Sequence, residues 1–382
     1  MILHVIENLR ETHGGPTFAA IGLAVEQAAR DKAVAIVCRE GPSTEEMRRL
    51  LQGPAGRRPV QLEVIADPDI AKMTATLARL APQIIHMHGV WDRIIRAAVS
   101  SAHQQRVPWV ITSHGMLHPV ALAKRRLAKW AYLRLWCRVV RDARHVMVLN
   151  GEERTFVAEH LHRPCSIVPA GVEVAADLPA PTGDFRRSLP ALGDRPFVMF
   201  LGRLDRIKGI DRLLDAYALA VRGGLGMDLV VAGPEFGEGE SVRARVRHLG
   251  LERSVHLPGP LWGRRKLDAL AECAIYAHRP RYEGYGLAVV EAMAAGRPVV
   301  TTAACHVDEA RDAAAIYLAA DEDRAFADAL LRLSSHPCEA AELGRRAHAW
   351  VLARGGWPAI EGRVDAVYRT VASRTSAVVS AG

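Results

Sequence analysis

Two glutamates stand eight positions apart in the stretch 281–300, and their surroundings suit the binding of a hydroxylated ligand. Glu283 opens a loop that contains Gly284 and Gly286, and Glu291 lies one to two turns into an expected apolar helix. Glycines let a backbone approach a ligand closely, and a helix start offers unpaired N–H groups to phosphate or sugar oxygens. An unpartnered carboxylate among apolar neighbours would be costly. We therefore interpret Glu291 as a functional residue, the alternative being a solvated position on an amphipathic helix.

A second pair of charged residues lies upstream, at a predicted strand-to-helix turn. The apolar run 196–201 predicts a buried strand, and the chain then turns through residues 202–209 into a helix from about Asp211. Arg203 and Lys208 both lie in this turn. Two cations beside a helix N-terminus repel each other unless an anion lies between them, which makes a diphosphate the natural ligand. For this segment taken alone, two solvated basic residues are the alternative.

Taken together, the two segments resemble the retaining glycosyltransferases of family 4, which have the GT-B fold. The family motif is a Glu, seven residues and a second Glu after a Gly-Arg…Lys-Gly loop, and residues 197–300 carry the resemblance most specifically. It implies that Arg203 and Lys208 bind the diphosphate of a nucleoside-diphosphate sugar. Glu283 would hold a sugar hydroxyl, and Glu291 the ribose hydroxyls. Backbone N–H groups of the loop Gly284, Tyr285, Gly286 and Leu287 would meet the sugar and the phosphates.

Other segments follow the order of the family. Gly14 and Gly15, in a loop before an expected helix, would face the donor diphosphate and the acceptor. His114, at the carboxyl end of an expected strand, would contact the transferred sugar near the reacting carbon. Residues 255–259 resemble the segment near the nucleobase, which places His256 there. The resemblance thus implies catalytic roles for His114, Arg203, Lys208 and Glu283.

The chain departs from the family pattern at three places. Ala170 stands where an Asn is usual, and Arg279 and Pro280 stand where Pro-Ser is common. Cys305 and His306 replace a frequent Gly-Gly pair beside the sugar and the diphosphate. The charged residues that carry the predicted chemistry are all present.

The elements that must position these residues alternate between strand and helix in both halves of the chain, which predicts two doubly wound parallel sheets. A chain of 382 residues also exceeds what one hydrophobic core normally organises. We therefore expect an α/β protein of the GT-B type, with two Rossmann-like domains facing across a cleft. Strands are expected at residues 1–6, 34–38, 84–87, 107–112, 146–149, 196–201, 227–232, 254–257, 274–277 and 298–301.

The proline-rich segment 177–183 is the expected junction between the domains. It gives an acceptor-side domain of residues 1–178 and a nucleotide-sugar-binding domain of residues 179–355. The final helical stretch, residues 356–382, is expected to cross back to the first domain, as the last helix of the family does.

Histidines on one expected strand raise a rival chemistry. His86 and His88 alternate, so both imidazoles lie on one side of the strand, and His114 and His118 follow downstream. Such a set would suit a metal hydrolase. The sequence lacks the further acidic and histidine residues at hydrolase spacing, and its six cysteines lack Cys-x-x-Cys spacing. We therefore expect no metal and no cofactor, and interpret His86, His88 and Trp91 as candidate contacts of an acceptor hydroxyl.

Much of the net charge of +8 is local. One expected helical segment carries basic residues mixed with aromatic ones and only Asp142 as an acid, which suits an anionic membrane surface. A solvated basic face with inward aromatics is the alternative. A nucleic-acid partner is not expected, because no recognised motif supports one. The residues are Lys124, Arg125, Arg126, Lys129, Arg134, Arg138, Arg141 and Arg144, with Trp130, Tyr132 and Trp136 among them.

The first residues lack the basic segment and apolar core of a signal peptide, and no apolar run approaches the roughly 18 residues of a membrane span. We expect a cytoplasmic protein, peripheral on the inner face of the cytoplasmic membrane if the basic segment docks there. The resemblance implies a hexosyltransferase that uses a nucleoside-diphosphate sugar and a glycan or lipid-linked glycan acceptor, in polysaccharide biosynthesis. A sugar-nucleotide epimerase of the same architecture and a catalytically silent membrane or partner-binding module remain open.

Overall fold

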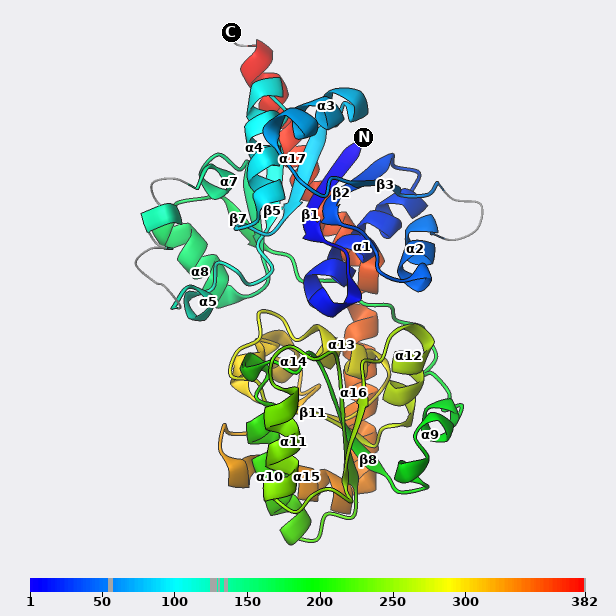
Figure 1. Ribbon diagram of the computed structural model, residues 1–382. Coiled ribbons are helices and arrows are strands. Elements are labelled where there is room, and N and C mark those ends of the chain that lie inside the picture. Colours follow the sequence, from blue (N-terminus) through cyan, green and yellow to red (C-terminus); the bar gives the residue numbers. More distant parts are fainter. Residues whose placement is uncertain (54–57, 124–128, 130, 134–136, 381–382) are drawn as a thin grey trace. The chain divides into compact units, whose positions relative to one another are not determined.

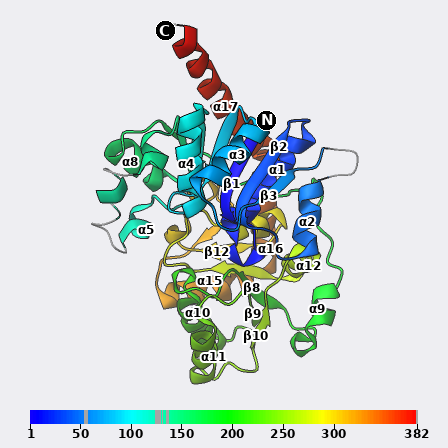
Figure 2. The ribbon, with the colours of Figure 1, turned by 45° about the horizontal axis from the view of Figure 1, so that its top comes forward.

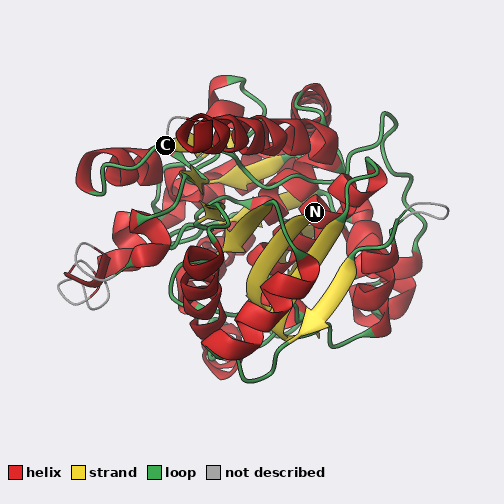
Figure 3. Ribbon diagram, turned by 90° about the horizontal axis from the view of Figure 1, so that it is seen from above, coloured by secondary structure: helices red, strands yellow, loops and turns green. Residues whose placement is uncertain are grey.

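The structure is a computed structural model that describes residues 1–53, 58–123, 129, 131–133 and 137–380 (Figure 1). The chain divides into two compact units. Unit 1 is Met1–Gly171 with Trp357–Gly382, and unit 2 is Val172–Gly356. The sequence analysis placed these boundaries at residues 178/179 and 355/356. Each unit has one parallel sheet with helices on both of its faces (Figure 3), which confirms the α/β class.

Unit 1 contains a seven-stranded sheet in which all strands are parallel. In chain order the strands are β1 (Ile2–Asn8), β2 (Val34–Glu40), β3 (Gln61–Val64), β4 (Ile84–His88), β5 (Trp109–Thr112), β6 (His145–Val148) and β7 (Cys165–Ile167). Their order across the sheet is β3-β2-β1-β4-β5-β6-β7. Residues of β1 and β4 pair in register, so that His4 lies beside His86.

Helices cover both faces of this sheet. They are α1 (Gly15–Ala29), α2 (Glu45–Gln52), α3 (Ile70–Leu80), α4 (Arg93–Gln105), α5 (Pro119–Ala123), α7 (Arg138–Arg141), α8 (Gly151–His160) and α17 (Gly356–Ser380). α3, α4 and α7 pack on one face through a core that includes Leu3 and Val5 of β1. α17 packs on the other face, where Ile360, Val364 and Tyr368 meet side chains of α1 and of the central strands.

Local sequence explains where several helices begin. The Asp69 carboxylate accepts a hydrogen bond from the Lys72 N–H at 2.7 Å and caps α3, and the Asn150 amide oxygen caps α8 from 2.9 Å. Such caps satisfy N–H groups that have no partner within the helix. Pro16 lies in the first turn of α1, where its missing N–H costs nothing.

Unit 2 contains a six-stranded parallel sheet (Figure 2). Its strands are β8 (Phe197–Leu201), β9 (Asp228–Ala232), β10 (Val255–Gly259), β11 (Ile275–His278), β12 (Val299–Thr301) and β13 (Tyr317–Leu318), in the order β10-β9-β8-β11-β12-β13. α10, α11 and α15 pack on one face, and α9, α12 and α13 on the other. The helices are α9 (Asp184–Ser188), α10 (Ile210–Arg222), α11 (Gly239–His248), α12 (Gly263–Glu272), α13 (Leu287–Ala294), α14 (Asp308–Asp312), α15 (Asp323–Ser335) and α16 (Pro337–Ala353).

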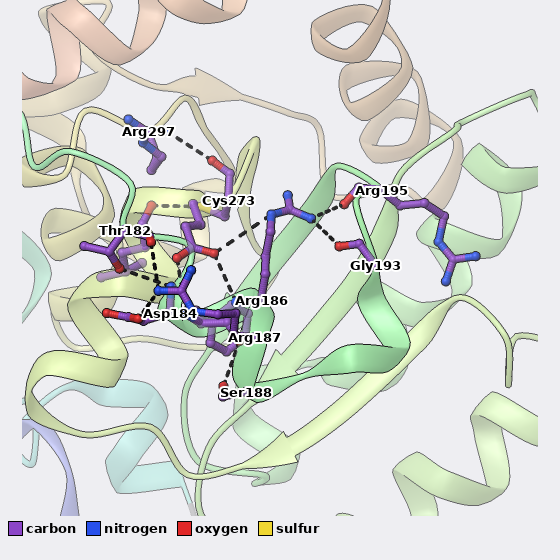
Figure 4. Close-up of polar contacts among 12 residues, drawn as sticks. Thr182, Asp184, Arg186, Arg187, Ser188, Gly193, Arg195, Cys273 and Arg297 are labelled. Carbon is purple, nitrogen blue, oxygen red and sulfur yellow. Dashed lines mark hydrogen bonds and ion pairs between the residues drawn. The ribbon is translucent and has the colours of Figure 1, made fainter.

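The start of unit 2 is held by hydrogen bonds to backbone carbonyls (Figure 4). The Arg186 guanidinium points at the carbonyl oxygens of Gly193 and Arg195, at 3.0 and 2.8 Å. The Glu272 carboxylate, at the end of α12, accepts hydrogen bonds from the N–H groups of Phe185 and Arg186, both at 3.2 Å. α9 is thereby fixed to α12 within the same unit.

The predicted basic helix falls partly outside the described residues, which exclude Lys124, Arg125, Arg126, Trp130, Arg134 and Trp136. In the part that is described, Arg138 and Arg141 bound the one-turn helix α7, and the Arg141 Nε donates to the Asp142 carboxylate at 2.9 Å. Among the described residues, no helix has the length and apolar character that crossing a membrane requires.

Each sheet has a point where the strand order reverses. The first strand of the unit lies there, between β2 and β4 in unit 1 and between β9 and β11 in unit 2. In open α/β sheets, ligands bind outside the carboxyl ends of the strands at such a point. The residues that follow β1 and β4, and those that follow β8 and β11, are therefore the first places to look for function.

Candidate functional site

In unit 2, the loop that follows β8 packs against the segment that follows β11. Lys208 ends a short 3₁₀ turn, and Gly209, with φ of 66°, precedes α10. A Cβ atom at Gly209 would lie 2.1 Å from the Arg279 carbonyl oxygen, so no other residue fits there. The predicted Gly-Arg…Lys-Gly turn thus depends on a glycine that lets two loops meet.

Two arginines of the second loop fasten it to the first. The Arg281 guanidinium forms two hydrogen bonds with the Asp211 carboxylate, at 2.7 and 2.6 Å, and the Arg281 N–H donates to the Ile207 carbonyl at 2.8 Å. Arg279 is almost fully buried and donates to the Arg212 carbonyl at 3.0 Å. The position where the family commonly has proline therefore carries a buried guanidinium that anchors the site loops.

The fastened loops bring Lys208 and Glu283 into contact. The Lys208 Nζ lies 2.5 Å from Glu283 Oε2, and both side chains are 14% exposed. Burial alone would raise the pKa of Glu283, but the Lys208 charge and a hydrogen bond from His278 outweigh it and lower that pKa to about 2. Glu283 is therefore ionised at neutral pH, and a cation and an anion face each other at the carboxyl ends of β8 and β11.

His278 is a member of this group that the sequence analysis did not single out. It ends β11, and its Nε2 lies 3.2 Å from Glu283 Oε2 while its ring stacks on Phe200. Its Nδ1 is buried and has no hydrogen-bond partner among the described residues. Burial lowers the pKa of His278, although Glu283 opposes this. A histidine as the last residue of an apolar strand, five positions before Glu283, was the signal available in the sequence.

Glu291 has a different partner. It lies in the second turn of α13, and its Oε1 is 2.8 Å from the Lys266 Nζ of α12. Lys266 was likewise not predicted, because nothing in the sequence indicates that α12 lies beside α13. The two glutamates of the motif thus carry separate lysine partners.

The loop between the two glutamates is shaped by the residues that depart from the family. A Cβ atom at Gly286 would lie 2.4 Å from the buried Cys305 sulfur, so the loop needs its glycine to pass Cys305. The His306 Nδ1 lies 2.6 Å from the Glu283 carbonyl oxygen and donates to it. α13 then begins at Leu287 without a side-chain cap among the described residues. The Leu287 N–H, which was predicted to meet the donor, instead donates to the Tyr285 carbonyl oxygen at 2.7 Å, and the N–H groups that follow in the first turn are the ones suited to an anion.

Two other predicted donor residues are placed differently. Arg203 lies with its guanidinium 4.5 Å from the centre of the half-exposed Phe236 ring and 4.0 Å from the Asp205 carboxylate. His256 lies 2.6 Å from the carboxylate of Asp228, the first residue of β9. That contact is near the amino ends of the strands, so the structure does not bring His256 to Lys208 and Glu283.

In unit 1, the predicted glycines follow the first strand. Gly14 precedes α1 and Gly15 is its first residue. A Cβ atom at Gly15 would meet nothing within 4 Å, so the backbone there is open to a ligand. Both glycines lie beyond the carboxyl end of β1, on the edge that the fold favours for binding.

The predicted histidines of unit 1 come together, and His4 of β1 joins them. The His88 Nε2 lies 2.9 Å from His4 Nδ1, and the His88 Nδ1 lies 3.0 Å from His114 Nε2. His86 instead bonds to the Tyr368 hydroxyl and to Thr112 Oγ1, both at 2.7 Å. His86 and His88 are buried, and both nitrogens of each ring have partners inside the unit.

The arrangement of His4, His86 and His88 suits hydrogen bonds better than a metal ion. One ring nitrogen of each lies within 4.8 Å of the others. Their rings stack, however, with centroids 4.3 to 5.2 Å apart and planes inclined by 18° to 34°. Imidazole lone pairs lie in the ring plane, so stacked rings do not aim three of them at one tetrahedral ion. His118 lies elsewhere, 3.0 Å from the Glu152 carboxylate.

The backbone that carries His114 is fixed by a buried carboxylate. His114 adopts φ of 51° just beyond β5, a left-handed conformation that a non-glycine residue adopts only when its surroundings hold it. Glu153 supplies this support, since its carboxylate accepts hydrogen bonds from the N–H groups of Leu117 and Leu149, at 3.0 and 3.1 Å. Burial raises the pKa of Glu153.

Trp91 contacts two residues of the basic and aromatic segment. It packs against the Tyr132 ring, with centroids 5.9 Å apart, and the Lys129 Nζ lies 5.7 Å from its centre. This predicted acceptor residue therefore belongs with the described part of the basic and aromatic segment.

Comparisons with known proteins match glycosyltransferase families in both halves of the chain. Residues 13–176 match the model described as Glycosyltransferase Family 4, and residues 182–350 match the one described as Glycosyl transferases group 1. The D-inositol 3-phosphate glycosyltransferase of Mycolicibacterium paratuberculosis is 32% identical over 244 residues, which are 60% of this chain and 54% of that protein. That of Actinosynnema mirum is 31% identical over 184 residues, 45% of this chain and 43% of that protein. The chain thus matches about half the length of these relatives.

Solved structures agree with the fold over nearly the whole chain. Anabaena HepE in complex with UDP-glucose has a TM-score of 0.80 at 20% identity and covers 97% of this chain and 99% of its own. WaaG, a glycosyltransferase involved in lipopolysaccharide biosynthesis, has a TM-score of 0.73 at 16% identity and covers 96% and 99%. At these identities the likeness establishes the GT-B architecture of two Rossmann-like sheets.

Proposed function

This chain belongs to the glycosyltransferases of family 4, and we propose that it transfers a hexose from a nucleoside-diphosphate sugar to a hydroxyl acceptor, with retention at the anomeric carbon. The observation that carries the proposal is the contact between Lys208 and Glu283 at the carboxyl ends of β8 and β11. In this proposal the cation would bind the diphosphate and the neighbouring carboxylate a sugar hydroxyl, at the point in the sheet where ligands bind in open α/β folds.

The charged residues of unit 2 would divide the donor between them. Lys208 and Arg203 would hold the diphosphate and stabilise the charge that develops as it leaves, which is usually the largest contribution to catalysis. Glu283 would accept a hydrogen bond from a sugar hydroxyl, and Glu291 from the ribose. The uncapped N–H groups at the start of α13 add a favourable field for phosphate oxygens.

The proposed reaction needs no protein base. The bond between the anomeric carbon and the leaving phosphate oxygen breaks, and the acceptor oxygen bonds to the same face of that carbon. The acceptor proton passes to the leaving phosphate. The residues of this chain would bind, orient and neutralise charge, and the two cations would replace a metal ion in that role.

A screen of donors tests the proposal directly. HepE binds UDP and UDP-glucose, so uridine and guanosine diphosphate hexoses are the first to try. A ligand at a hundred times its Kd stabilises a protein by about 2.7 kcal/mol, which a thermal shift would detect. Transfer is then measured with labelled donor, and the anomeric configuration of the product by NMR. An inverted product would contradict retention, and an epimerised donor formed without acceptor would favour the epimerase.

For the acceptor, we propose a lipid-linked glycan, reached through the basic and aromatic segment at residues 124–144. Basic residues near an anionic surface contribute about 1 kcal/mol each, so adsorption should be weak and sensitive to salt. The test is co-sedimentation with liposomes of increasing anionic content, comparing the wild type with a variant in which Lys124, Arg125, Arg126 and Lys129 are changed to Glu. Equal binding to neutral and anionic liposomes would favour a soluble acceptor.

A further inference from the structure

A row of four hydrogen-bonded side chains runs through unit 1 and consists of Gln27, His4, His88 and His114. The Gln27 Oε1 on α1 lies 2.8 Å from His4 Nε2 on β1, and His4 Nδ1 lies 2.9 Å from His88 Nε2 on β4. The His88 Nδ1 in turn lies 3.0 Å from His114 Nε2, beyond β5. The row begins in the core, since Gln27 and His4 have no exposed surface, and it ends at the partly exposed His114.

The three imidazoles of this row are neutral at physiological pH. Burial lowers the pKa of His4 and of His114 to about 4, and it lowers the pKa of His88 well below 6.5. A neutral imidazole has one N–H donor and one nitrogen acceptor. In a row of neutral rings joined nitrogen to nitrogen, each ring therefore donates to one neighbour and accepts from the other. The group at one end, by being a donor or an acceptor, fixes which nitrogen is protonated in every ring.

The buried amide at the start sets that direction. The Gln27 carbonyl oxygen can only accept, so His4 Nε2 carries the proton and His4 Nδ1 accepts from His88 Nε2. The His88 Nδ1 then accepts from His114 Nε2. The Gln27 side chain also interacts with the Tyr368 hydroxyl, and its carbonyl oxygen is the atom that bonds to the row. At the far end, the Nδ1 of His114 is left with its lone pair.

We propose that Gln27, His4 and His88 are positioning residues that hold His114 in the tautomer with its proton on Nε2. The Nδ1 of His114 is then a fixed acceptor for a hydroxyl group of the transferred sugar. The assignment of the sugar as the partner rests on the proposed function, whereas the tautomer follows from the hydrogen bonds of unit 1 alone. Two aspects of His114 are thus fixed independently, its backbone through Glu153 and its ring nitrogens through the row.

His86 provides a matched control within the same strand. It is buried like His88 and stacks on it with ring centroids 4.3 Å apart, but it bonds to Tyr368 and Thr112 rather than to the row. Replacing either histidine with phenylalanine removes one buried imidazole of β4 and keeps a ring. Only His88→Phe interrupts the path from Gln27 to His114.

The tautomer is measured by long-range ¹H–¹⁵N correlation NMR on protein labelled in its histidine rings. We expect the Nε2-protonated pattern for His114 in the wild type and in His86→Phe. In His88→Phe, and in Gln27→Met as a second way to break the row, we expect a mixture of the two tautomers. An Nδ1-protonated His114 in the wild type, or an unchanged pattern in both row variants, would overturn the proposal.

Kinetics of sugar transfer distinguish positioning from a merely structural role. In His88→Phe and Gln27→Met, kcat should fall by roughly tenfold or more below that of His86→Phe, because misplaced contacts cost rate, while the KM for the donor changes less. Equal kcat in all three variants would overturn the positioning role. A wild type that transfers no sugar would overturn the proposed function and the sugar contact, and the NMR result would still decide the hydrogen-bond row.

Discussion

The two sheets differ in the polar groups near their switch points, which are neutral in unit 1 and charged in unit 2. In unit 1 the switch-point strands carry buried imidazoles, whose neutral rings bond to each other and to Gln27, Tyr368 and Thr112. In unit 2 the corresponding position carries an ion pair, Lys208 with Glu283.

One kind of fold thus carries two different kinds of polar group. A doubly wound sheet sets where the strand ends meet, and it leaves the chemistry of the side chains at those ends open. Burial removes charge from His4, His88 and His114 of unit 1, because desolvation is the largest influence on each of their pKa values. In unit 2, each of the two motif glutamates is buried or half-buried beside a lysine, so charge is retained at the edge where an anionic diphosphate is proposed to bind.

The largest effect should come from removing the cations of unit 2. We expect Lys208→Ala and Arg203→Ala each to lower kcat by about 10²- to 10³-fold, the range for losing one preorganised charge-stabilising group. Steady-state kinetics measure this, with circular dichroism to check folding. Arg206→Ala is the matched control, since it removes an exposed cation from the same turn. Near-normal turnover in both folded variants would contradict the proposal that the diphosphate binds at this edge of the sheet.

A smaller effect should follow from breaking the ion pair as a structural contact. We expect Lys208→Met and Glu283→Gln each to lower the free energy of unfolding by about 2–3 kcal/mol, the scale of hydrogen bonds to charged groups. The double variant should lose less than the sum, because the partners act together. Denaturant unfolding gives these values.

The control for this pair is the exposed pair of Arg324 and Asp328 on α15. Exposed pairs at this helical spacing contribute about 0.3–0.5 kcal/mol, so Arg324→Met should change the free energy of unfolding little. Additive losses at Lys208 and Glu283 would show that the two residues do not support each other.

Acid should distinguish the two units at a smaller scale. The pKa of His4 falls from 6.5 to about 4 on folding. As pH falls below 6.5, His4 therefore takes up a proton in the unfolded chain but stays neutral in the folded protein, and the free energy of unfolding falls. Between pH 7.5 and 5.5 the loss is about 1.4 kcal/mol for each ring that stays neutral. Glu283, whose pKa is lowered from 4.5 to about 2, loses its contribution only as pH falls from 4.5 towards 2.

Denaturant unfolding at pH 7.5 and 5.5 checks this contrast. His86→Phe should reduce the loss by about the contribution of one ring, while Glu283→Gln should leave the loss unchanged. The assignment of acid sensitivity to unit 1 would be wrong if the decrease in the free energy of unfolding between pH 7.5 and 5.5 became smaller in the Glu283 variant and stayed the same in the His86 variant.

The smallest expected effect is that of a chelator. Because the two cations of unit 2 can neutralise the leaving group, and the ring nitrogens of His4, His86 and His88 already have hydrogen-bond partners within unit 1, EDTA should leave transfer unchanged. Transfer measured before and after chelation, with Mg²⁺, Mn²⁺ and Zn²⁺ added back, tests this. Activity that chelation abolishes and a divalent ion restores would contradict the metal-independent reaction and return attention to His4, His86 and His88.

Local sequence was enough for most of the fold. Every predicted strand overlaps a strand of the structure, because central strands of a parallel sheet are buried on both faces and read as apolar runs. The three strands absent from the prediction, β3, β7 and β13, lie at the edges of their sheets. The sequence of β3, Gln-Leu-Glu-Val, alternates polar and apolar residues, since an edge strand packs only in part and need not be a buried run.

The amino-acid sequence identified the charged groups and the loops that carry them, together with the alternation of strand and helix that predicts two sheets. Sheet order decided the partners. His4 reaches His88 because β1 lies beside β4, and Lys266 reaches Glu291 because α12 and α13 pack on the same face of the unit 2 sheet. Parallel pairing joins segments that are far apart in the chain through hydrogen bonds and shared cores. A local pattern of apolar residues indicates which face of an element is buried, but it does not indicate which other element packs on that face.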